Sequence, residues 1–191
     1  PPAGAVAATS WWESPERFLE EARVRLEEFL EDARAGMLER VGSLEEVCRH
    51  MVRLLAEGDH LHVRALDFRK SRNDLTTHMI NVAIFAVKIA NGMGLKQEIL
   101  PRVALGGYVH DVGMIRFPAD RYDHFQSLSP QEVEALKRHP EEGYGILRAL
   151  GPEYAWLADV AYQEHEREDG SGYPRGLRGA QIGEIAKIVG L

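Results

Sequence analysis

The chain contains few cysteines and no long apolar run. These absences argue against a disulfide-bonded protein and against a membrane-spanning one. Its 191 residues include one cysteine, Cys48, so no intrachain disulfide can form and nothing indicates an oxidising compartment. The best apolar stretch, 82–90, is interrupted by Lys88 and is shorter than the roughly 20 residues that span a membrane. Residues 1–10 lack the basic start of a signal peptide. We therefore expect a soluble cytoplasmic protein without a membrane span, in which Cys48 is a small buried side chain.

Net positive charge is lacking as well. Acidic residues outnumber basic ones by 30 to 23, which gives a formal net charge of −7. Because general nucleic-acid binding usually needs a basic surface, this balance argues against a nucleic-acid partner. A phosphate ligand is still compatible with an acidic protein if metal ions supply the positive charge locally. The apolar content of 45% is typical of a folded domain with a core.

The sequence shows no strand-like alternation of apolar and polar residues and no internal repeat. It contains helix signals instead. Ser14 and Pro15 are typical of a helix start, and apolar residues follow them at helical spacing as far as Ala33. Ser43 with Glu46 matches a capping box and predicts a second helix start. The sequence therefore predicts an all-α fold.

Helix signals continue along the rest of the chain. The expected helices are 73–92, 97–110, 129–139, two that begin at Pro140 and Pro152, and a last one from about Ala180. Gly113 is expected to be the C-terminal glycine of the helix 97–110. The glycine-rich stretch 169–179 is expected to be a loop. The irregular stretch 117–128 is expected to be functional, since long loops without secondary structure usually are.

Side chains that can bind metals stand at the ends or on the inner faces of these expected helices. His78 is expected on an inner, apolar helix face, where a histidine is more often part of the core than a ligand. His110-Asp111 ends a helix and offers one nitrogen and two carboxylate oxygens, which suits two closely spaced ions. His139 and Glu164-His165-Glu166 also end helices. Each group is ambiguous alone, but a helical bundle can bring such groups together.

The order of these groups resembles the HD-GYP family, the HD-superfamily metal-dependent phosphodiesterases that cleave cyclic di-GMP. The likeness covers about 72–191 and continues in the flanking text "RHPEEGYGIL" and "GYPRGLRGAQI". The resemblance implies an HD-type helical bundle and a catalytic dyad of His110 and Asp111, with Asp111 bridging two ions. The metal ligands that it implies are His78, His110, Asp111, His139 and His165, with Glu164 as a further ligand in place of a usual histidine. Asp74 stands where some family members have a glutamate that binds a third ion.

The same resemblance implies roles for the loop and for the cofactors. Gly172, Tyr173 and Pro174 would shape the loop over the substrate, and Arg167 or Asp169 would hold that loop in place. The cofactors would be two or three divalent ions, with iron or manganese favoured.

The chain is expected to divide into three parts. Residues 1–12 would be a linker or an artificial start, and 13–70 an N-terminal helical lead-in. Residues 71–191 would be the catalytic domain, truncated on its C-terminal side.

Four departures from the family pattern bear on activity. Glu164 stands where the family usually has a histidine, and its carboxylate favours a harder ion such as manganese or iron. Met114 and His124 stand where the family usually has lysines, so two positive charges are missing near the reacting phosphate. The family also has a further metal-binding aspartate just beyond the position of Leu191.

The predicted reaction is hydrolysis of cyclic di-GMP to pGpG or GMP by metal-activated water. One alternative is a degenerate domain that binds a cyclic dinucleotide or a partner such as a GGDEF-domain protein without turnover. Another is an HD phosphohydrolase for a different nucleotide. The amphipathic segment 11–35 could pack on the domain or form a homodimer.

Overall fold

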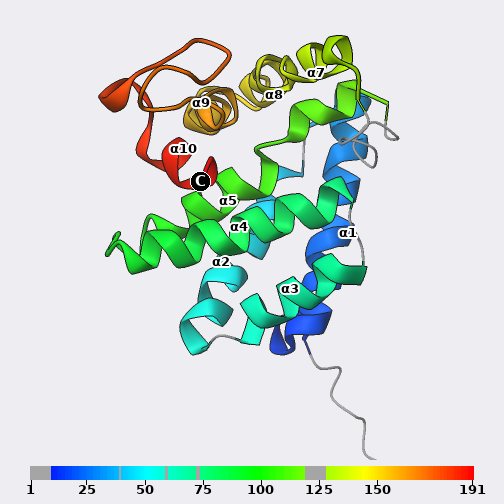
Figure 1. Ribbon diagram of the computed structural model, residues 1–191. Coiled ribbons are helices and arrows are strands. Elements are labelled where there is room, and N and C mark those ends of the chain that lie inside the picture. Colours follow the sequence, from blue (N-terminus) through cyan, green and yellow to red (C-terminus); the bar gives the residue numbers. More distant parts are fainter. Residues whose placement is uncertain (1–9, 39, 59, 72–73, 119–127) are drawn as a thin grey trace, which may run out of the picture.

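The computed structural model describes residues 10–38, 40–58, 60–71, 74–118 and 128–191, and over these residues the fold is all-α, as predicted (Figure 1). The longer helices are α1 (Pro15–Arg34), α2 (Val41–Glu57), α3 (His60–Ser71), α4 (Leu75–Gly92), α5 (Leu100–Val109), α8 (His139–Arg148) and α9 (Ala155–Gln163). The shorter ones are α7 (Pro130–Leu136), α10 (Glu184–Val189) and the 3-10 turns η1 (Trp11–Glu13), η2 (Val112–Arg116), η4 (Pro152–Tyr154) and η5 (Gly179–Gln181). In the described part of the chain, the only β-type pairing is an isolated bridge between Asp169 and Arg178.

The helices α4 and α5 cross at the centre of the molecule, with α2 and α3 on one side and α8 and α9 on the other (Figure 1). Both central helices are rich in apolar residues and bury most of their length, as expected for helices covered on several faces. Gly107 allows their close approach, because a Cβ atom there would lie 2.7 Å from the Cα atom of Ala83. The crossing fixes the C-terminal end of α5, where His110 follows.

The predicted lead-in is packed into the same core as the rest of the chain. The predicted apolar face of α1 is buried, and it comprises Phe18, Leu19, Ala22, Leu26, Phe29, Leu30 and Ala33. These residues belong to one hydrophobic cluster that extends to Val189 near the end of the chain. The buried hydroxyl of Tyr108 on α5 donates a hydrogen bond to the carbonyl of Ala22 on α1. The division of the chain at residue 70 stays a prediction.

Several predicted details are confirmed. Ser14 caps α1, and Ser129 with Glu132 forms the predicted capping box of α7. Cys48 is fully buried, and 169–179 is a loop. Among the described helices, none has the length and apolarity that a membrane crossing requires.

Other predicted boundaries are wrong. The helix α2 begins at Val41 without a side-chain cap, so Ser43 lies inside it and its hydroxyl donates to the carbonyl of Arg40. His139 begins α8 instead of ending α7, because Pro140 fits the first turn of the helix that follows it. The last helix begins at Glu184, after the short turn η5.

The prediction for Gly113 is wrong as well, and the structure gives this glycine a different role. The chain continues from α5 into η2 without a residue of positive φ, so no glycine cap ends α5. A Cβ atom on Gly113 would lie 2.0 Å from the carbonyl oxygen of His139 and 2.5 Å from the amide of Gly143. Gly113 therefore lets α8 approach the turn after Asp111. Of the predicted irregular stretch, 119–127, which includes His124, lies outside the described residues.

Candidate metal centre

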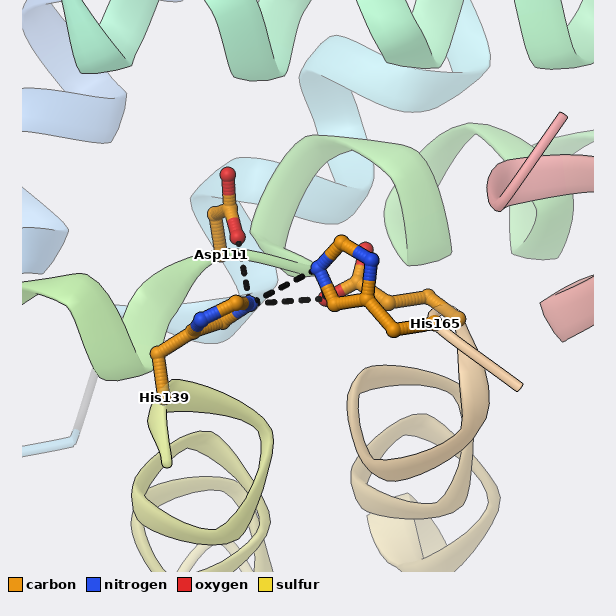
Figure 2. A group of neighbouring side chains, drawn as sticks. Asp111, His139 and His165 are labelled. Carbon is orange, nitrogen blue, oxygen red and sulfur yellow. Dashed lines mark hydrogen bonds and ion pairs between the residues drawn. The ribbon is translucent and has the colours of Figure 1, made fainter. Parts of the chain in front are cut away.

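Four helix ends bring six of the seven predicted ligands into one cluster. His78 lies in the first turn of α4, and His110 with Asp111 lies between α5 and η2. His139 is the first residue of α8, and Glu164 with His165 directly follows α9. Figure 2 shows the side chains of Asp111 and His165 directed toward the ring of His139. Residues that are distant in the sequence thus meet because the helices that carry them end at the same place.

Asp111 lies at the centre of the cluster, and its two oxygens face different histidines. Oδ1 lies 3.1 Å from Nε2 of His139. Oδ2 lies 3.3 Å from Nε2 of His110 and 3.6 Å from Nε2 of His78. A carboxylate whose two oxygens point to separate sets of nitrogen atoms has the geometry of a bridging ligand.

Glu164, the departure from the usual histidine, lies inside the cluster. Its side chain is 3% exposed; Oε2 lies 3.5 Å from Nε2 of His110, and Oε1 lies 3.7 Å from Nε2 of His139. Oε1 is buried and accepts no hydrogen bond within the described structure. A buried carboxylate oxygen without a donor is costly unless a cation or a proton meets it. The position of Glu164 therefore fits a metal ligand.

Backbone carbonyls orient the two buried histidines. Nδ1 of His110 lies 2.8 Å from the carbonyl oxygen of Gly107, and Nδ1 of His139 lies 2.7 Å from that of Leu136. Each Nδ1–H can donate to its carbonyl, which leaves the lone pair of Nε2 facing the cluster. This is the usual arrangement behind a metal-binding histidine.

The two buried carboxylates of the cluster, Asp111 and Glu164, need positive charge nearby to balance their own. Burial alone would lower the pKa of His110, but the charges of Glu164 and Asp111 outweigh it and raise that pKa to about 9. His139 responds in the same way: against the effect of burial, the same carboxylates raise its pKa to about 10. Burial raises the pKa of the Glu164 carboxyl. In the protein alone, the carboxylates thus draw protons onto two imidazoles, and divalent cations would supply the same charge.

Two groups of side chains could each hold an ion. Within a group, the ligand atoms lie within 4.8 Å of one another. One group consists of Asp111, His139, Glu164 and His165, and the other of His78, His110 and Asp111. Asp111 belongs to both groups, as a bridging role requires. The nitrogen and oxygen donors present therefore fit divalent metal ions.

Two predicted ligands differ from expectation in their surroundings. The predicted inner, apolar location of His78 is wrong: its side chain is 44% exposed, and its Nε2 faces Asp111 at the rim of the cluster. Asp74 lies outside both groups. Its Oδ1 caps α4 by accepting a hydrogen bond of 2.8 Å from the amide of Thr77, and its Oδ2 lies 3.1 Å from Nη1 of Arg23. A third ion at Asp74 would compete with both interactions.

The predicted loop residues lie against the cluster. The ring of Tyr173 stacks on the ring of His165, with 4.7 Å between their centroids. The backbone amide of Tyr173 also donates a hydrogen bond of 3.1 Å to the backbone carbonyl of His165. Pro174 follows a cis peptide bond. A Cβ atom on Gly172 would lie 2.4 Å from the carbonyl oxygen of His165, so only glycine fits there. The loop thus covers the His165 side of the cluster.

Glu166 holds this loop, a role that was not predicted from the sequence. Its buried carboxylate accepts hydrogen bonds of 2.7 Å from the amide of Arg175 and 2.8 Å from that of Leu177. The sequence signal for such a residue is a carboxylate between a predicted ligand and a glycine-rich loop, and Glu168 shares it. Asp169 makes a local turn with Ser171, and Arg167 donates a hydrogen bond of 2.9 Å to the carbonyl of Gly190.

Comparisons with known proteins show which family this chain resembles. A family model described as HD domain matches residues 26–191. The chain is 33% identical over 120 residues to a cyclic di-GMP phosphodiesterase of Thermotoga maritima and 32% identical over 122 residues to one of Pseudomonas aeruginosa. It is 32% identical over 115 residues to the 3'3'-cGAMP-specific phosphodiesterase 1 of Vibrio cholerae. These alignments cover 61%, 63% and 60% of this chain and 33%, 30% and 26% of the relatives, so the chain spans a third or less of their length.

A solved structure shows the same fold. An HDG"Y"P protein from Bdellovibrio bacteriovorus matches with a TM-score of 0.81 and 17% sequence identity. The match covers 98% of this chain and 60% of that chain. The predicted HD-type helical bundle is therefore confirmed.

Proposed function

The chain belongs to the HD domain family, as a domain of the HD-GYP type, and we propose that it is a metal-dependent phosphodiesterase that hydrolyses cyclic di-GMP. The observation that carries the proposal is the position of Asp111, whose two oxygens face two groups of nitrogen and oxygen ligands. Similarity to proteins named as phosphodiesterases of cyclic dinucleotides supports this substrate class. The expected product is pGpG, followed by GMP if both phosphodiester bonds are cleaved.

Each part of the cluster has a task in this reaction. Asp111 would bridge two ions, His78 and His110 would complete one site, and His139, Glu164 and His165 the other. Divalent ions held there would lower the pKa of water and neutralise charge that develops on the phosphate. The carbonyls behind His110 and His139 keep their Nε2 atoms directed into the site. Tyr173 and the loop held by Glu166 would limit solvent access on the His165 side.

We propose that two ions bind, since the described side chains form two groups and Asp74 is held by Thr77 and Arg23. Two carboxylates among the ligands favour a harder ion, so manganese and iron are the ions to try first.

The test is turnover of cyclic di-GMP by the whole chain, read by chromatography, with manganese and with anaerobic ferrous iron. Asp111→Ala is the inactive variant. Asp159→Ala, which changes an exposed aspartate on α9, is the matched control. Production of pGpG by the wild-type and Asp159→Ala proteins, and not by Asp111→Ala, is the expected result. Metal-loaded wild-type protein without product would contradict the proposal.

A second candidate function is a regulatory domain that binds a cyclic dinucleotide, or a partner such as a GGDEF-domain protein, without turnover. The observation in its favour is Met114, an apolar side chain 9% exposed in the turn after Asp111, where the family usually has a cation. The double variant Met114→Lys with Glu164→His tests it. A gain of activity from an inactive wild type would favour the regulatory domain, and activity of the wild type would exclude it.

A further inference from the structure

A cavity of about 340 Å³ opens beside the metal centre, between α1, the start of α4 and the turn η2. Its volume is at the lower end of the range of small-molecule sites. Asp74 lines it one helical turn, about 6 Å, before the ligand His78. Met114 lines it three residues after Asp111. A ligand with its phosphate at the metal centre can therefore place another of its groups in this cavity.

The charges around the cavity disfavour an anionic group. Its lining includes two guanidinium groups, Arg23 and Arg34, and three carboxylates, Glu27, Glu31 and Asp74. The charge of Arg23 is already paired, because its guanidinium lies 2.6 Å from the carboxylate of Glu27 and 3.1 Å from that of Asp74. A second phosphate would thus meet more negative than positive charge, whereas a neutral group with hydrogen-bond donors would not.

Glu31 and Arg34 supply the remaining polar contacts. Both side chains are exposed on the last turns of α1, and neither forms an ion pair with another residue in the part of the chain that the structure describes. Together they offer a carboxylate that accepts and a guanidinium that donates. Leu30 and Phe117 add apolar surface to the same cavity.

We propose that this cavity is a guanine subsite; the inference rests on the proposed function and names the base that the same site selects. Guanine presents the N1–H and N2–H donors side by side, next to the O6 acceptor. The Glu31 carboxylate accepts from N1–H and N2–H, the Arg34 guanidinium donates to O6, and the ring packs on the apolar wall. Adenine carries an acceptor at N1, which a carboxylate repels. The lead-in helix α1 thus sets base specificity for a centre built by the other helices.

The test compares cyclic di-GMP with cyclic di-AMP as inhibitors of the hydrolysis of bis(p-nitrophenyl) phosphate, a phosphodiester without a base. The readout is the ratio of the two inhibition constants, taken from initial rates so that little of either dinucleotide is consumed, and checked against the ratio of dissociation constants in the Asp111→Ala variant. Wild-type protein is expected to prefer cyclic di-GMP. Glu31→Gln and Arg34→Ala are each expected to reduce this preference roughly tenfold, the usual effect of losing a hydrogen bond to a charged group. Arg148→Ala, which changes an exposed arginine in the last turn of α8, is the matched control and should leave the ratio unchanged.

The outcomes separate this inference from the proposed function. An unchanged ratio in both Glu31→Gln and Arg34→Ala, with folding verified by circular dichroism, overturns the guanine subsite and leaves the phosphodiesterase proposal standing. Absence of hydrolysis that depends on Asp111 contradicts the proposed function instead. In that case the dissociation constants of the two dinucleotides, measured by calorimetry on the same variants, give the same ratio and decide the subsite.

Discussion

Replacing Glu166 by alanine should release the loop 169–179 from the metal centre. Its carboxylate accepts two backbone N–H groups, from Arg175 and Leu177. A hydrogen bond to a charged group contributes about 1.5–3 kcal/mol. Water can replace the partner of the exposed Arg175, whereas Leu177 is 8% exposed and its amide would lose its acceptor. We therefore expect the loop to lose roughly 2–4 kcal/mol of local stability.

The measurement is amide hydrogen exchange of the loop, because a local loss of stability is seen there before it affects global unfolding. A loss of 2–4 kcal/mol corresponds to exchange that is roughly 30- to 700-fold faster at Leu177. The matched control is Glu168→Ala, which removes an exposed ion pair of 2.5 Å with Lys187. Such pairs contribute about 1 kcal/mol or less. The rate of phosphodiester hydrolysis should fall in Glu166→Ala, because Tyr173 loses its support.

Equal exchange rates at Leu177 in the two variants would refute this reasoning, since they would mean that the buried carboxylate does not hold the loop. A global loss of stability in Glu166→Ala, with all helices exchanging faster, would refute it as well. In that case Glu166 would support the fold and not the loop.

Three further predictions follow from the site and its supports. Asp111→Ala should lose both bound ions and His78→Ala one, as counted by metal analysis of the purified proteins; equal losses would contradict the bridging role. Although burial acts in the opposite direction, hydrogen bonds from the first turn of α4 and the charge of a nearby arginine hold the pKa of Asp74 below its ordinary value. The stability that it contributes is therefore present at neutral pH and lost as the pH falls below about 4, and Asp74→Asn should flatten this acid limb in urea unfolding series. Gly113→Ala should cost about 3 kcal/mol in chemical denaturation, because its methyl group would collide with the carbonyl of His139; an unchanged midpoint would refute the close contact.

Local signals in the sequence determined the helical fold, and the resemblance to the HD-GYP family indicated the proposed ligands. Helix caps such as Ser14 and Ser129 depend on contacts within a few residues, so they can be read without the fold. The proposed ligands were found because the order of His78, His110-Asp111, His139 and His165 carries the family pattern, and their role stays a prediction. The same local reasoning failed at Ser43, because the helix begins two residues before this capping signal, at Val41, without a side-chain cap.

The tertiary structure alone decided how these residues act together. No spacing rule shows that the two oxygens of Asp111 face different histidines, because this depends on where α4, α5, α8 and α9 end relative to one another. Nor does the sequence separate Glu166 from its acidic neighbours, since its role depends on burial against two loop amides. Close backbone contacts at Gly113 and Gly172 are likewise invisible in a linear sequence, because each joins segments that only the packing of the helices brings together.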